Sequence, residues 1–209
     1  MLMKVCAGIV VVAFIVSAIS MSSVPDSMAT HWDLRGDADG YSDKMMGLFM
    51  LPGIMVFVLL LFLAVPRIDP LKENIAKFKR EYEGMGVVML LFLMLVHIHV
   101  ITWNMGWMVL PNSILPAGLA CLYIYIGHLL KHVKRNYFVG IKTPWTLHDE
   151  RVWDSTHKVG ARLFKYCGVI AFAGLFMGDS AILFAIAPAI GSTVYLFAYS
   201  YLQFKALNP

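Results

Sequence analysis

Charged residues are scarce in this sequence. They make up 14% of its 209 residues, whereas about 25% is usual in a soluble domain. Hydrophobic residues reach 59%, and the mean hydropathy is +0.71. Apolar runs longer than a soluble core helix needs account for much of this excess. The composition excludes an ordinary soluble protein and predicts an integral membrane protein at the cell membrane.

Cysteines and catalytic signatures are also few. Cys6, Cys121 and Cys167 all lie within apolar runs, and no paired spacing indicates a disulfide framework or a zinc ribbon. The chain has no nucleophile elbow, no HExxH and no phosphate loop. No Asp, Glu, Lys or Arg falls in the middle of an apolar run, which argues against a carboxylate-based transporter.

Six apolar runs are present, and each is close to the roughly 20 residues that cross a bilayer. They cover residues 3–20, 46–66, 86–110, 114–130, 160–177 and 181–204. The sequence therefore predicts an all-α membrane protein with six transmembrane helices. The first run has an alternative interpretation as a cleavable signal peptide, although it is long for one.

The basic residues are distributed unevenly among the connecting segments. With six crossings and both termini in the cytosol, 15 of the 17 Lys and Arg residues lie inside, and only Arg35 and Lys44 lie outside. Because cytoplasmic loops carry an excess of Lys and Arg, this segregation predicts cytosolic N and C termini.

The runs divide the chain into three predicted parts. Residues 1–66 form an N-terminal membrane domain with an outer loop at 23–45, and residues 67–113 form a linker helix and the third span. Residues 114–209 form the last domain, with an inner loop at 131–157. In the linker, Leu71, Ile75, Phe78 and Tyr82 recur at helical spacing, which predicts a helix lying on the inner membrane surface.

The outer loop combines acidic and aromatic residues. It holds five Asp against Arg35 and Lys44, together with Trp32 and Tyr41. This mixture suits recognition of an external ligand with cationic or apolar parts. A loop anchored at the interface by its aromatic residues is an equally good interpretation. Calcium binding is disfavoured because Arg35 occupies the place of the first ligand of a calcium loop.

The inner loop contains helix-start signals. Pro144 can open a helix, and Thr146 with Asp149 resembles a capping box. The following segment is amphipathic and is predicted to lie in the inner headgroups before turning into the fifth span, anchored by Trp145 and Trp153. An enzyme using His148, Asp149 and His157 is an alternative, as is a small-solute transporter.

Polar residues within the predicted spans are few. His97 and Asn104 are seven residues apart and share a helix face, whereas His99 points nearly opposite. If the two helices brought His97, His128 and Cys121 together, these side chains would suit a soft metal ion. Hydrogen bonding between helices is the more common use of such side chains, so the prediction is no metal, no cofactor and no catalytic residue.

Two long motifs resemble the SdpI family of bacterial and archaeal membrane proteins. The inner motif comprises Asn136, Gly140, Lys142, Thr143, Pro144, Trp145, Thr146, Leu147, Trp153, Thr156 and His157. The outer motif, which resembles the membrane domain of unknown function that often precedes that family, comprises His31, Trp32, Asp33, Gly36, Asp39, Gly40, Tyr41 and Lys44.

The resemblance implies an immunity protein that neutralises a secreted, membrane-active peptide toxin and relays its presence to a sequestered cytosolic repressor. The implied partners are membrane lipid, an extracellular peptide and that repressor, with no direct contact to nucleic acid. Three positions depart from the family pattern: Lys142 replaces Arg, His128 replaces Asn and Asp33 replaces Asn. A Lys cannot reproduce the bidentate fork of Arg, so a carboxylate or phosphate contact there would differ.

Overall fold

A computed structural model describes residues 1–107 and 111–208 of the chain. It contains six long helices: α1 (Leu2–Ser20), α2 (Lys44–Ile68), α4 (Lys79–Asn104), α5 (Pro111–Leu130), α7 (Glu150–Gly174) and α8 (Ala181–Leu207). The shorter elements are β1 (Ser27–Trp32), β2 (Ala38–Asp43), α3 (Lys72–Ala76), α6 (Pro144–His148) and a 3-10 turn, η1 (Gly178–Ser180). Residues 108–110, at the end of the predicted third span, lie outside the described residues.

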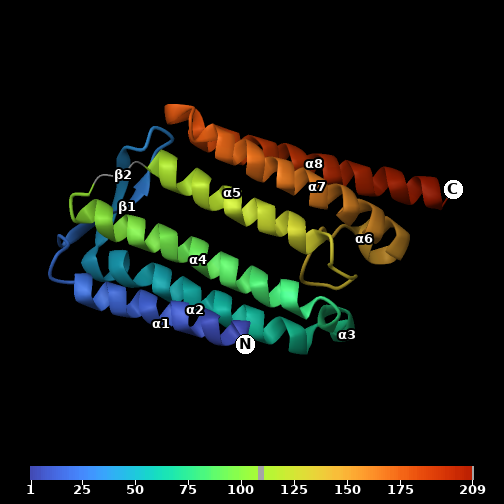
Figure 1. The fold of residues 1–209 in the computed structure, drawn as a ribbon, viewed down its shortest axis with the longest axis horizontal. Helices are drawn as coiled ribbons and strands as arrows, with labels where there is room; N and C mark the ends of the chain where they lie inside the picture. The colour runs from blue at the N-terminus through green and yellow to red at the C-terminus, as the bar shows by residue number, and fades with distance from the viewer. Residues whose placement is uncertain (108–110, 209) are drawn as a thin grey trace.

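The long helices run side by side, so the molecule has two distinct ends (Figure 1). The strands β1 and β2 lie at one end, which we call the hairpin end. Both termini, α3 and α6 lie at the other, which we call the basic end because the Lys- and Arg-rich segments 67–80 and 131–151 lie there. This arrangement places both termini at the same end as the two basic loops.

Five helices are long and apolar enough to cross a membrane: α1, α2, α4, α5 and α8. The helix α7 is not among them, because its first half is rich in charged residues. It is also one continuous helix, so the predicted turn between an interface helix and the fifth span is wrong. The helical membrane architecture is confirmed, whereas the sixth crossing and the side on which the termini lie stay predictions.

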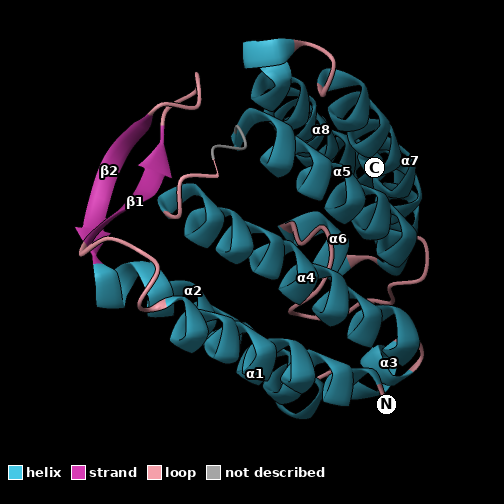
Figure 2. Cartoon of the chain, turned by 60° about the vertical axis from the view of Figure 1, so that its left-hand side comes forward, coloured by secondary structure: helices cyan, strands magenta, loops and turns pink. Residues whose placement is uncertain are grey.

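The outer loop is not irregular, and the fold is not purely helical. Residues 27–43 form an antiparallel hairpin that stands beyond the start of α2 (Figure 2). The sequence does not reveal these strands because burial along β1 does not alternate: Met28 and Ala29 are adjacent and both buried.

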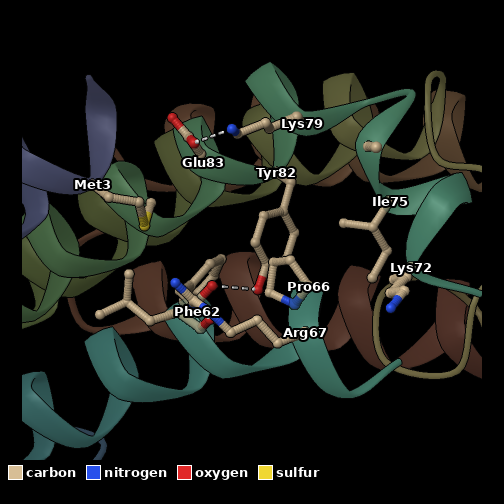
Figure 3. Close-up of a pocket in the computed structure, with 11 residues that line it drawn as sticks. Met3, Phe62, Pro66, Arg67, Lys72, Ile75, Lys79, Tyr82 and Glu83 are labelled. Carbon is tan, nitrogen blue, oxygen red and sulfur yellow. Dashed lines mark hydrogen bonds and ion pairs between the residues drawn. The ribbon is translucent and has the colours of Figure 1, made fainter. Parts of the chain in front are cut away.

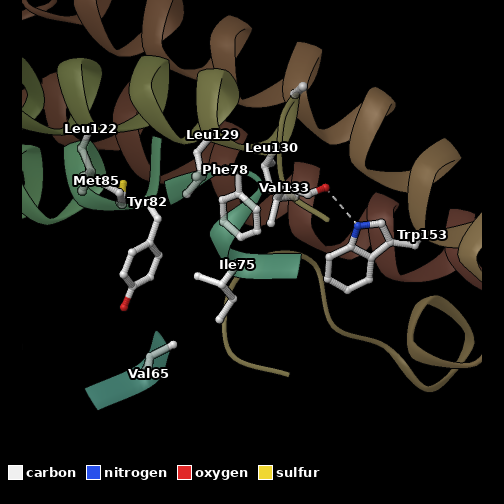
Figure 4. Packing of buried hydrophobic residues seen from close by; sticks show 11 residues of the cluster. Val65, Ile75, Phe78, Tyr82, Met85, Leu122, Leu129, Leu130, Val133 and Trp153 are labelled. Atoms are coloured by element: carbon white, nitrogen blue, oxygen red, sulfur yellow. Dashed lines mark hydrogen bonds between the residues drawn. The ribbon is translucent and has the colours of Figure 1, made fainter. Parts of the chain in front are cut away.

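The largest buried cluster ties the basic end together (Figure 4). Ile75, Phe78 and Tyr82 are 1–3% exposed and belong to the same cluster as Leu129, near the end of α5, and Val133, just beyond it. The prediction that this apolar face lies on the membrane surface is therefore wrong. Its helix is interrupted after α3, and the apolar residues face the protein interior instead of lipid.

The helices form two groups of three. Helices α1, α2 and α4 pack against one another, as do α5, α7 and α8, and α4 against α5 is the principal joint between the groups. The linker helix of the predicted three-part division thus packs with the N-terminal group. The division itself stays a prediction.

Candidate functional sites at the two ends

The hairpin is closed by a turn built on Asp33. Its carboxylate accepts hydrogen bonds from the backbone N–H groups of Arg35 and Asp37, at 2.8 and 3.0 Å. Gly36 has φ of 90°, a conformation that side-chain-bearing residues rarely adopt. These bonds lower the pKa of Asp33, so the turn keeps its negative charge at neutral pH.

Asn104 holds the hairpin onto α4. Its side-chain oxygen accepts from the Ala29 N–H at 2.8 Å, and its side-chain nitrogen donates to the Ala29 carbonyl at 2.9 Å. One amide thus satisfies both backbone groups of a strand residue, as a neighbouring strand would. Gly47 of α2 lets Met28 approach from the other side, because a Cβ there would lie 2.8 Å from the Met28 sulfur.

A pocket of about 280 Å³ lies beneath the hairpin, between β1, α2, α4 and α5. Trp32 and His99 lie in its wall with their ring centroids 5.0 Å apart, and Trp103 packs edge-on against both rings. His99 is 2% exposed, yet neither of its ring nitrogens has a hydrogen-bond partner, and Trp32 Nε1 is likewise unpartnered. Buried polar groups are normally paired, so three unpaired nitrogens beside one pocket require an explanation.

The exposed side of the hairpin carries charged and aromatic residues. Asp39 lies 2.5 Å from His31 Nδ1, and both side chains are open to solvent. Tyr41 is 63% exposed. Gly40 faces His31 so closely that a Cβ would lie 2.8 Å from the His31 Cβ. Lys44 pairs with Asp26 at 2.8 Å, which lowers the pKa of Asp26. All eight residues of the outer motif therefore belong to the hairpin or its junction with α2.

The inner motif is a tightly bonded connection at the basic end. Asn136 is fully buried, and its side chain makes four hydrogen bonds, two to N–H groups and two to carbonyls of residues 134–139. Asp69, 2% exposed, accepts from the Leu71 and Tyr137 N–H groups at 2.6 and 2.9 Å. The loop after α5 is thereby bonded to the loop after α2.

His157 joins this loop to α7. Its Nδ1 donates to the Trp153 carbonyl at 2.8 Å, so its Nε2 carries the lone pair and accepts from the Ile141 N–H at 2.9 Å. Gly140, with φ of 117°, passes close over the ring, and a Cβ there would lie 2.5 Å from Nε2. Burial lowers the pKa of His157 to about 4, so the ring is neutral at physiological pH.

Two sequence predictions about this motif are wrong in detail. The cap of α6 is Thr143, which forms a capping box with Thr146 and bonds Ser200 of α8 at 3.1 Å, while Asp149 caps α7 instead. Trp153 is fully buried, stacks on His157 and donates to the Val133 carbonyl at 3.3 Å, so it is not a headgroup anchor. Capping choices between closely spaced Thr residues depend on φ and ψ, which spacing alone does not reveal.

The remaining residues of the inner motif occupy different environments. Trp145 is half-buried against Phe197 and Tyr201 of α8. Thr156 is fully buried with no partner for its hydroxyl, and Leu147 packs at the edge of the large cluster. Among the motif residues, only Lys142 and Pro144 are exposed. The motif is therefore mainly a structural connection between α5, α6, α7 and α8.

Two of the three residues in the enzyme alternative are already engaged, and the third, His148, is exposed. Both nitrogens of His157 are engaged in backbone bonds, and Asp149 is engaged by Arg151 at 2.6 Å and by the N terminus of α7. These bonds lower the pKa of Asp149. Neither group is free to take a proton from a substrate at neutral pH.

The predicted intramembrane polar residues do not come together. His97 is buried and lies 3.0 Å from Ser17 of α1, while Asn104 bonds the hairpin. His128 is exposed at the basic end, beside Glu81. Because Glu81 and His97 are 16 residues apart on α4, about 24 Å along the axis, a metal shared by His97, His128 and Cys121 is excluded by this arrangement.

Among the hollows at the basic end, two are lined by several charged residues. One, of about 390 Å³, lies between α1, α2, α3 and α4, where Tyr82 donates to the Phe62 carbonyl at 3.0 Å and Lys79 pairs with Glu83 (Figure 3). The other is a groove of about 550 Å³ between the end of α5 and the first half of α7. Its cationic lining residues are Lys131, Lys134, Lys158, Arg162 and Lys165.

Comparison with known proteins matches both motifs. Residues 132–200 match the SdpI/YfhL protein family, and residues 8–56 match a domain of unknown function (DUF1648). The Immunity protein SdpI of Bacillus subtilis (strain 168) is 26% identical over 201 residues, which cover 96% of this chain and 94% of that protein. The resemblance to the SdpI family is confirmed. No solved structure matches.

The SdpI resemblance and the helices together establish where the protein resides. Its relative aligns from end to end, and five helices of this chain are long and apolar enough to cross a bilayer. The chain is a multi-pass protein of the cell membrane. The two matched ranges, 8–56 and 132–200, contain the hairpin and the inner motif respectively.

Proposed function

We propose that this protein protects the cell that carries it against a secreted, membrane-active peptide. The observation that carries the proposal is the similarity to Immunity protein SdpI over 96% of the chain. Because His157 and Asp149 are engaged by backbone groups and by Arg151, an enzymatic role that uses them is the weaker alternative.

The hairpin end is the proposed site of peptide recognition. Residues 23–45, which include the hairpin, hold five Asp against Arg35 and Lys44, so this surface attracts cationic peptides. The pocket beneath it offers an apolar wall with the unpaired nitrogens of Trp32 and His99. A peptide that inserts an apolar side chain there and presents a carbonyl oxygen to Trp32 Nε1 would satisfy a group that the free protein leaves unpaired.

The basic groove between α5 and α7 is the proposed contact for a cytosolic partner. Five cationic side chains surround it, against Asp154 alone. Such a surface favours an acidic partner, such as a repressor held at the membrane. In this account, peptide binding at the hairpin end changes the packing of α4 against α5, which connects the two ends.

The test is survival of sensitive cells that express this protein. They are exposed to a panel of secreted membrane-active peptides that includes the one neutralised by the SdpI namesake. Survival should exceed that of cells with an empty vector for at least one peptide. Survival no higher than the vector for every peptide, at a membrane abundance matched by immunoblot, would contradict the immunity role.

A charge-matched pair of variants tests the recognition site. Asp37→Asn with Asp39→Asn removes two exposed negative charges at the hairpin end and should weaken protection. Glu73→Gln with Glu150→Gln removes two exposed negative charges at the basic end and should leave protection unchanged. Added salt should reduce the difference between the pairs, because exposed charges are screened beyond about 8 Å at physiological ionic strength. Equal protection by both pairs would locate recognition elsewhere.

A further inference from the structure

Three potential metal ligands meet where α4 and α5 pack at the basic end. Glu81 lies in the first turn of α4, and His128 and His132 are four residues apart at the end of α5. One ligand atom from each lies within 4.8 Å of the other two. Glu81 makes no ion pair with any described residue, although a cluster of cationic residues surrounds this end of the molecule.

The register of the two helices brings these ligands together. Gly84 has no side chain, so Tyr125 reaches the backbone of α4 and donates to the Glu81 carbonyl at 3.1 Å. A Cβ on Gly84 would lie 1.9 Å from the Tyr125 hydroxyl, so this approach requires glycine. Since α4 and α5 run in opposite directions, one turn beyond Tyr125 places His128 beside Glu81 (Figure 1).

A backbone hydrogen bond orients the second histidine for binding. His132 Nδ1 lies 2.9 Å from the His128 carbonyl oxygen, which can only accept, so Nδ1 carries the proton. In neutral His132 the lone pair is then on Nε2, which is free to coordinate. Histidine ligands of zinc typically donate their other ring nitrogen to a carbonyl or carboxylate in this way. The rings of His128 and His132 lie 4.8 Å apart.

We propose that Glu81, His128 and His132 bind one divalent transition-metal ion, of which Zn²⁺ is the best match. Two imidazoles and one carboxylate form a typical zinc ligand set with a fourth position open to water, and bond lengths near 2.0–2.2 Å bring the ligand atoms to about 3.3 Å from one another. All three side chains are at least partly exposed, so they can rotate to close the remaining distance.

The bound ion would link the two helix groups. Glu81 belongs to the group of α1, α2 and α4, and the two histidines belong to the group of α5, α7 and α8. The two groups contact each other mainly where α4 packs against α5. An ion that binds only the folded arrangement stabilises it in proportion to its concentration. The concentration of the metal ion would thus affect how firmly α4 packs against α5, between the hairpin end and the basic groove. This proposal does not depend on the proposed immunity role.

The test measures Zn²⁺ binding to the tag-free full chain in nanodiscs by calorimetry and by metal analysis. We expect one ion per chain, a raised melting temperature, and with Co²⁺ the strong visible absorption of a four-coordinate site. His128→Asn, His132→Asn and Glu81→Gln should each lower the affinity by at least about tenfold. Glu81→Gln keeps the backbone carbonyl that Tyr125 uses, so it leaves the helix register intact.

Matched controls separate this site from other donors. His148→Asn removes an exposed histidine elsewhere at the basic end, Cys121→Ser removes an exposed thiol, and His31→Asn removes the exposed histidine of the hairpin. None of them should change the affinity. Undetectable binding at micromolar Zn²⁺, or unchanged binding in the His128→Asn, His132→Asn double variant, would overturn the proposal.

Discussion

At the scale of single residues, His157 determines how the inner motif responds to pH. Folded His157 has a pKa of about 4, whereas an unfolded histidine has one near 6.5. Between these values the unfolded chain binds more protons than the folded chain. The stabilisation is therefore complete above pH 6.5 and is lost as the pH falls toward 4. Protonation also places a proton on Nε2, opposite the Ile141 N–H.

We predict that the melting temperature of the purified protein falls as the pH is lowered from 6.5 to 4, and that His157→Gln reduces this dependence. A Gln side-chain oxygen can still accept from Ile141 but does not titrate in that range. His148→Asn, which removes an exposed histidine, should retain the wild-type slope. The measurement is thermal unfolding of each variant across that pH range, and parallel slopes for all three proteins would exclude His157 as the titrating group.

The chemistry of single residues was only partly predictable from the sequence. The outer and inner motifs identified residues such as Asn136 and His157 but did not reveal their roles, because a buried side chain with four hydrogen bonds looks the same in a motif as an exposed ligand. The spacing of His128 and His132 is visible in the sequence. Their partner Glu81 is not, since the pairing depends on the register of two helices.

At the scale of elements, the coupling of the hairpin to α4 depends on one amide. The Asn104 side chain makes the two hydrogen bonds to the Ala29 backbone that a third strand would otherwise make. Two-stranded hairpins are marginally stable in water without further packing. The attachment to α4 is therefore a main source of order for the proposed recognition surface.

We predict that Asn104→Ala loosens the hairpin and leaves the helices intact. It leaves the partly buried Ala29 backbone groups unpaired, at a cost of about 1–3 kcal/mol for each group. Hydrogen exchange should quicken for residues 27–43 and not for α7. Thr102→Ala is the control, since the Thr102 hydroxyl bonds only within α4. Equal exchange in all three proteins would show that the hairpin is held by other contacts.

The apolar pattern predicted where the helices lie better than it predicted what their apolar faces contact. Long apolar runs located all six long helices, because a helix of about 20 apolar residues has few alternatives in a bilayer. The same periodicity put Ile75 and Phe78 against lipid, whereas they pack in the protein core. An apolar face is compatible with either environment, and only the buried cluster that contains Ile75, Phe78 and Leu129 distinguishes them.

At the scale of the whole molecule, the two ends have different chemistry. The hairpin end has acidic residues and an apolar pocket, and the basic end has the cationic groove and both termini (Figure 1). This polarity was predictable from the distribution of Lys and Arg. The pocket was not, because it combines residues of β1, α2, α4 and α5 that are far apart in the chain.

The central claim is that a peptide is recognised in the pocket beneath the hairpin, and His99→Phe tests it most directly. This change removes two unpaired buried nitrogens and keeps a ring of similar shape, so it should not destabilise the fold. The measurement is the survival of peptide-treated cells at equal membrane abundance, together with the melting temperature. We predict an unchanged or higher melting temperature and at least about tenfold lower survival than with the wild type. Full protection by His99→Phe would contradict recognition through these nitrogens.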